Sequence, residues 1–209
     1  MLLKDLMVMH TEPIHLLIEE PGLGDYQPEH LRATKTPGEY AFPFTPAKSG
    51  PYRIWADVVP MASGVQELPF ADLQAAGEAV PPVDTANRLI SSVGGYQFSL
   101  SFPEGTLVPV QAGVARRITI TVTDPAGQLA TGLEPVIQAF AHLAGFYDDL
   151  RTVEHVHPTG GDILNPALRG GPALGFLFYP PRAGFIRLYC RVKVGGKMIF
   201  APFNLNVVP

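Results

Sequence analysis

The chain has 209 residues, a formal net charge of −4, 16% charged residues and 46% hydrophobic residues. Its 21 glycines and 22 prolines make up about a fifth of the chain, against a usual share of roughly 12%. The hydrophobic content is sufficient for a core and excludes disorder. No basic stripe points to nucleic acid, and no apolar run reaches the roughly 18 residues of a membrane helix. Apolar runs that glycine and proline interrupt this often are typical of an all-β chain.

The predicted elements, in chain order, are short strands. We expect them over residues 13–19, 40–45, 51–58, 64–68, 96–102, 115–123, 175–179, 185–194 and 197–208. A short helix is expected around 69–76. Apolar spacing over 133–146 suits a helix, but its match to 6–19, which contains Pro13, favours a strand. The first residues are too few for a signal h-region and Asp5 interrupts them, so we expect no signal peptide in the sequence given.

The chain contains an internal repeat. Residues 50–58 match 184–192, and residues 42–44 match 176–178, both at an offset of 134. The pairs His15/His142, His30/His157 and Leu6/Leu133 match at an offset of 127. The change of offset predicts a seven-residue insertion in the second copy, within the glycine-rich stretch 160–172. Near the ends, Pro69-Phe70 matches Pro202-Phe203 at an offset of 133.

The repeat predicts the domain organisation. Residues 1–76 form an incomplete β-sandwich repeat, 77–88 a linker and 89–209 a complete repeat. The second copy opens with a front section that carries two strands, and the first copy has no counterpart of it. A sandwich without two strands exposes an edge and part of its core. We therefore expect a shortened N-terminus, packing of the two copies on each other, or a homodimer or other protein partner over the gap.

One motif recurs in the repeat: His-Leu, then His-x-His-Pro, Phe-x-Phe and Gly-x-(Tyr/Ile)-Arg-(Leu/Ile)-aromatic. In the second copy it reads His142-Leu143, His155-Val156-His157-Pro158, Phe176-Leu177-Phe178 and Gly184 to Tyr189. The motif resembles a group of uncharacterised bacterial secreted proteins with immunoglobulin-like β-sandwich domains, some suspected of binding copper or other heavy metals. The resemblance implies two tandem immunoglobulin-like antiparallel sandwiches in an extracytoplasmic location, periplasmic or secreted. The first copy departs from it, because Pro28-Glu29-His30 replaces His-x-His.

The histidines are the candidate metal ligands. His155 and His157 lie two residues apart, so on an extended chain both face the same side. His142, on the preceding strand, could supply a third imidazole, a ligand that suits copper, zinc or nickel. The weaker counterparts lie in the first copy: His10, His15 and His30. Alternatively, each histidine hydrogen-bonds the backbone and holds the same corner in both copies.

Catalytic motifs are absent from the sequence. There is no Gly-x-Ser-x-Gly, and Cys190 lies in the middle of a predicted strand as a half-buried thiol. The adjacent carboxylates Glu19 and Glu20 face opposite ways on a strand and are expected to be solvated. Arg53 and Arg187 recur at one place in each copy and predict a salt bridge on the sheet surface. We therefore expect a non-catalytic structural or protein-interaction module; the alternative is a protein that binds copper or another transition metal.

Overall fold

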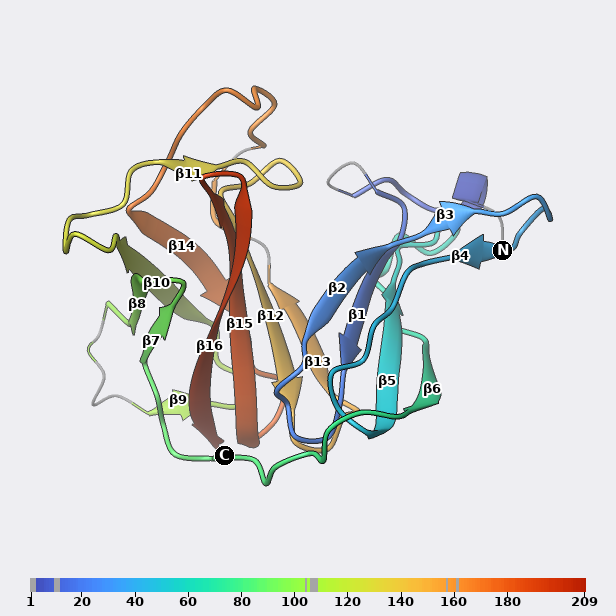
Figure 1. Cartoon of the computed structure of the whole chain (residues 1–209), viewed down its shortest axis with the longest axis horizontal. Helices are drawn as coiled ribbons and strands as arrows, with labels where there is room; N and C mark the ends of the chain where they lie inside the picture. Colours follow the sequence, from blue (N-terminus) through green and yellow to red (C-terminus); the bar gives the residue numbers. More distant parts are fainter. Residues whose placement is uncertain (1–2, 10–11, 104, 106–108, 157, 161) are drawn as a thin grey trace. The chain divides into compact units, whose positions relative to one another are not determined.

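The computed structural model describes residues 3–9, 12–103, 105, 109–156, 158–160 and 162–209. The described residues form sixteen strands and one 3-10 turn, Leu3–Asp5, without any α-helix. The chain is therefore all-β, as predicted (Figure 1). None of its described helical segments is long and apolar enough to span a membrane. The chain divides into two compact units, Met1–Val83 and Asp84–Pro209.

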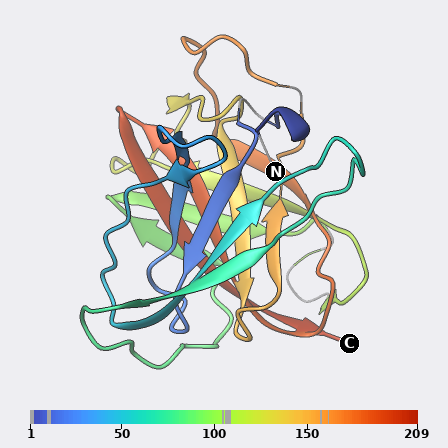
Figure 2. The same cartoon turned by 90° about the vertical axis from the view of Figure 1, so that its right-hand side faces the viewer.

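The first unit is built on one four-stranded antiparallel sheet. Its strands are β1 (His15–Glu19), β2 (Gln27–His30), β3 (Arg32–Ala33), β4 (Tyr40–Ala41), β5 (Gly50–Asp57) and β6 (Phe70–Ala75). The sheet has the order β2-β1-β5-β6, seen in Figure 2, and β3 pairs with β4 separately.

Two predictions for the first unit are wrong. The short helix expected around 69–76 is strand β6, because pairing with β5 outweighs the local helix preference of its alanine and leucine residues. The strand expected over 64–68 is irregular chain with one isolated bridge, Val58 to Glu67. Gly64 has a φ of 62°, which ends the extended backbone there.

The second unit has two sheets. Its strands are β7 (Ile90–Val93), β8 (Tyr96–Ser101), β9 (Val110–Gln111), β10 (Arg116–Thr123), β11 (Leu133–Glu134), β12 (Ala141–Tyr147), β13 (Val153–Val156), β14 (Ala173–Phe178), β15 (Gly184–Val194) and β16 (Lys197–Val208). The sheet orders are β14-β10-β8-β7 and β13-β12-β15-β16-β9, with β11 also paired to β15. Side chains of both sheets, among them Phe98 and Phe176 from one and Leu188 and Phe203 from the other, belong to a single buried core.

The segment 133–146 is extended, as the repeat predicted. It forms β11 and β12, joined by a tight turn that a Val136–Ala139 bridge closes. Ile137 and Gln138 have positive φ angles of 48° and 61° in that turn. Its helix-like apolar spacing therefore arises from two strands with a turn between them.

The two units share strand order and register. The order β2-β1-β5-β6 of the first corresponds to β13-β12-β15-β16 of the second. His15 pairs with Asp57 and His142 with Arg191, which are equivalent positions of the repeat. The matched Pro-Phe dipeptides, however, are offset by one residue, because Trp55 pairs with Phe70 while its equivalent Tyr189 pairs with Pro202. A shift of one residue reverses the face of a strand.

The front section of the second unit supplies four strands, β7 to β10, instead of the two predicted. Three of them form the second sheet with β14. The first unit has no such sheet among its described residues. The strand predicted over 40–45 therefore has no β10-like partner to extend along, and it ends at Ala41. Phe42 and Phe44 are consequently half-buried, whereas their equivalents Phe176 and Phe178 are fully buried.

Both ends of the predicted linker, 77–88, are hydrogen-bonded to a unit. At its start, the Ser49 N–H donates to the Glu78 carbonyl (2.6 Å). At its end, Asn204 Nδ2 donates to the carbonyls of Asp84 (2.9 Å) and Ala86 (3.1 Å). The division between the compact units accordingly falls between residues 83 and 84.

Candidate functional site

Two histidines make the same hydrogen bond in the two units. His15 Nε2 lies 3.0 Å from the Met9 carbonyl, and His142 Nε2 lies 2.9 Å from the Val136 carbonyl. Each carbonyl belongs to the residue six positions earlier in the chain. A carbonyl only accepts, so Nε2 carries the proton in both rings. The backbone hydrogen bond expected under the structural interpretation is therefore present at both positions.

The local chain path explains this arrangement. Each of these carbonyls begins a tight turn that a bridge closes, Met9 to Glu12 in one unit and Val136 to Ala139 in the other. The strand that follows carries the histidine back alongside the turn. Both rings are buried, and each imidazole adds a second donor to a carbonyl that already accepts an N–H across its turn, Met9 from Glu12 (3.1 Å) and Val136 from Ala139 (3.1 Å).

His155 lies beside His142. It occupies β13 opposite Ala144 of β12, and the centroids of the two imidazole rings are 6.2 Å apart. His157, the third predicted ligand, lies outside the described residues, as does His10. His30 ends β2, where its Cα is paired with that of His15. Among the residues that the structure describes, no group of three or more His, Cys, Asp or Glu side chains is arranged to hold a metal ion.

Two titratable groups near this corner are shifted by burial. Glu154 precedes His155 on β13, and desolvation raises its pKa to about 7. The carboxyl therefore changes its charge near neutral pH. Cys190 lies in β15, on a strand as predicted, but it is fully buried and not half-buried, and burial raises the pKa of its thiol. A thiol that stays protonated is a poor nucleophile and a poor metal ligand.

Glu19 and Glu20 are fully buried, so the expectation that they are solvated is wrong. Glu19 Oε1 accepts the N–H groups of Glu20 (3.0 Å) and Asp25 (3.1 Å), and Glu20 accepts those of Gly22 and Gly24. Glu19 Oε2 has no hydrogen-bond partner in the part of the chain that the structure describes. Burial holds the pKa of Glu19 well above its ordinary value. Alternation along the strand could not reveal this, because the loop after β1 folds back over both carboxylates.

The repeated arginines have different partners. Arg53 forms two short contacts to Asp72, from Nε (2.6 Å) and from Nη2 (2.7 Å), which confirms the predicted salt bridge in the first unit. Arg187 Nε donates to Asn204 Oδ1 (3.0 Å), so the residue at the equivalent position of the second unit is an amide and not a carboxylate. Asp72 and Asn204 are equivalent positions of the two sheets, each paired in register with its arginine.

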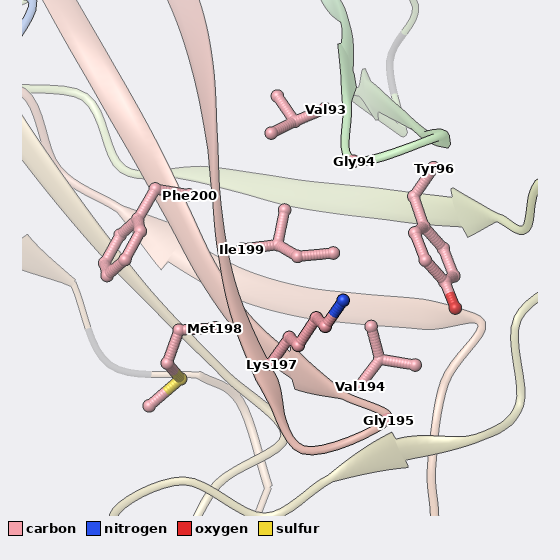
Figure 3. A pocket seen from close by; sticks show the side chains of 9 residues that line it. All are labelled: Val93, Gly94, Tyr96, Val194, Gly195, Lys197, Met198, Ile199 and Phe200. Atoms are coloured by element: carbon pink, nitrogen blue, oxygen red, sulfur yellow. The ribbon is translucent and has the colours of Figure 1, made fainter.

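A pocket of about 570 Å³ in the second unit was not predicted from the sequence. It lies where the β7–β8 hairpin meets the β15–β16 hairpin (Figure 3). Its lining residues are Val93, Gly94, Tyr96, Val194, Gly195, Lys197, Met198, Ile199 and Phe200. The sequence feature that could have indicated the two hairpins around this pocket is the Val-Gly-Gly sequence, which occurs at residues 93–95 and again at 194–196.

One family model matches the chain over residues 91–209, which is more than half of its length, and its description is a domain of unknown function, DUF8832. The chain belongs to the DUF8832 family. The DUF8832 match begins within β7 and includes both sheets of the second unit, the histidine corner at β12 and β13, and the pocket. No curated protein matches the chain.

Proposed function

We propose that this DUF8832 protein is a non-catalytic, extracytoplasmic module with a structural or protein-interaction role. The observation that carries the proposal is the hydrogen bond from Nε2 of His15 and His142 to a turn carbonyl, in both units. This bond accounts for the recurrence of the histidine without any chemistry. The location follows from the resemblance to secreted bacterial proteins.

We also propose that both units are immunoglobulin-like β-sandwiches and that the first lacks its N-terminal strands. The equal strand order and register of the two units support this relationship. In the second unit, two sheets share a core and are antiparallel except for the β9–β16 pair, which is close to the arrangement that such sandwiches have. The face of the first sheet that lacks this cover is where we place a protein partner or a second copy.

The structural role predicts an effect of histidine removal in metal-free protein. His142→Ala removes one of the two hydrogen bonds to the Val136 carbonyl, which keeps the bond from the Ala139 N–H, so it should lower the free energy of unfolding by about 0.5–1.5 kcal/mol. His15→Ala should have a similar effect on the first unit. The measurement is urea unfolding after dialysis against a chelator, and the loss should be the same when Cu(II) or Zn(II) is added.

A second candidate function is the binding of copper or another transition metal. The 6.2 Å separation of the His142 and His155 rings favours it, because two imidazoles on adjacent strands can approach one ion. With its Nε2 proton on Val136, His142 would ligate through Nδ1. Calorimetric titration with Cu(II) and Zn(II) decides between the two functions: micromolar binding that His155→Ala abolishes would replace the structural proposal, and its absence supports it.

A further inference from the structure

The pocket of the second unit is framed by two hairpins of the same design. Val93-Gly94-Gly95-Tyr96 joins β7 to β8, and Val194-Gly195-Gly196-Lys197 joins β15 to β16. All four glycines have positive φ angles between 56° and 83°, which is the requirement of a two-residue hairpin turn with both central residues left-handed. Such turns fix the register of their strands. The residues that flank them are thereby held in place at the pocket.

The lining combines an apolar wall with two hydrogen-bond donors. Val93, Val194 and Ile199 supply branched aliphatic groups, and Met198 and Phe200 extend this surface. The polar side chains are Lys197 and Tyr96. In Figure 3 the Lys197 side chain extends from the hairpin toward the side where the Tyr96 hydroxyl lies. No acidic side chain lines the pocket.

The two donors have no partner within the described part of the chain. Neither the Lys197 ammonium nor the Tyr96 hydroxyl makes a hydrogen bond or an ion pair to another described residue. The other lysine of this unit, Lys193, differs, because its Nζ lies 3.3 Å from Glu134 Oε2. An ammonium and a hydroxyl beside an apolar wall together favour an anionic acceptor that carries an apolar body.

We propose that this pocket binds a small amphipathic carboxylate. The carboxylate would accept hydrogen bonds from Lys197 and Tyr96, and the apolar body would cover Val93, Val194 and Ile199. The volume of about 570 Å³ lies within the range of small-molecule sites. A cation would meet the like charge of Lys197 with no acidic group to offset it. This inference goes beyond the proposed function and does not depend on it.

The test uses decanoate as the probe and decan-1-ol as its uncharged counterpart, with the full chain. Binding is measured by calorimetry, and amide NMR shifts locate the probe. Lys197→Met should weaken decanoate binding at least tenfold, which is the loss of one charge-assisted hydrogen bond, and should leave decanol binding unchanged. Lys193→Met is the matched control, because this lysine lies on the same hairpin outside the pocket, and it should change neither affinity more than twofold.

Tyr96→Phe provides a second measurement that keeps the aromatic ring. It should weaken decanoate several-fold and leave decanol binding unchanged, and it applies equally if Lys197→Met does not fold. The proposal is overturned by equal affinities of the parent for decanoate and decanol, or by no binding at millimolar decanoate. It is also overturned by NMR shifts that lie away from the two hairpins, or by equal losses in Lys197→Met and Lys193→Met.

Discussion

The two units build the same sheet but cover it differently. In the second unit, the sheet of β12, β15 and β16 shares its core with the sheet of β10, β8, β7 and β14. In the first, the corresponding buried cluster contains Leu16, Ile18 and Tyr52, with half-buried Phe42 and Phe44 packed against it. The register is nevertheless the same in both. Strand order and register are thus set within this sheet and its turns, whereas the depth of burial depends on the second sheet.

The largest expected effect tests this difference in cover. Phe178→Ala removes a fully buried ring of the second unit and should lower the free energy of unfolding by about 3–5 kcal/mol. Phe44→Ala removes its half-buried equivalent, so its cost should be about 1–2 kcal/mol. Urea unfolding followed by amide NMR measures both units. Equal costs would contradict the comparison, because they would mean that Phe44 is covered as completely as Phe178.

A smaller effect is expected at Glu19, which occupies the place of Phe146 in the second unit. Burial raises the folded-state pKa of Glu19 above its unfolded value. The folded state therefore binds more protons, and the stability of the first unit should fall as pH rises from about 4.5 through the raised pKa. Glu19→Gln should remove this loss and raise the stability at pH 8 by at least about 1 kcal/mol.

The measurement for Glu19→Gln is unfolding followed by the fluorescence of Trp55, the single tryptophan of the chain, which lies buried in the first unit. At pH 4 the parent carboxyl is largely protonated in both states, so the variant and the parent should then have similar stability. A difference that is independent of pH would show that ionisation of Glu19 is not its cause.

The smallest effect is expected at the arginine pair. Asp72→Asn gives the first unit the Arg–Asn pairing that Arg187 and Asn204 have in the second. Asp72 is largely exposed, and its hydrogen bonds with Arg53 lower its pKa, so its contribution is present at neutral pH and lost on acidification. The variant should change the folding equilibrium less than about fivefold, and the difference should vanish in 1 M NaCl.

Strands with a strictly alternating pattern could be predicted from the sequence. β10 alternates buried and partly exposed residues along its whole length, and its predicted bounds differ from the observed ones by one residue. β6 could not be predicted, because it is an edge strand with almost every residue exposed and therefore shows no alternation. β2 contains Pro28 and the charged Glu29, and only its pairing with β1 makes it a strand.

The candidate site was predictable where the repeat exposed it. The recurrence of His15 and His142 at one offset marked a common corner, and both make the same backbone hydrogen bond. The burial of Glu19 and the pocket beside Lys197 could not be inferred. The burial of Glu19 depends on a loop that turns back over it, and the pocket depends on two hairpins that lie far apart in the chain. Neither arrangement produces a periodic pattern in the sequence.

The pairing of β9 with β16 determines when the second unit can be completed. β9 lies parallel to the end of β16, where Val110 pairs with Val207, and both valines are buried in the core. The two partners lie far apart in the chain, so closing this pair carries a large chain-entropy cost. During synthesis β9 is made early, but it cannot pair until the end of β16 has been made. The hairpins β7–β8 and β15–β16, in contrast, can form as soon as their own residues have been synthesised. Assembly of the second unit therefore ends with its last strand.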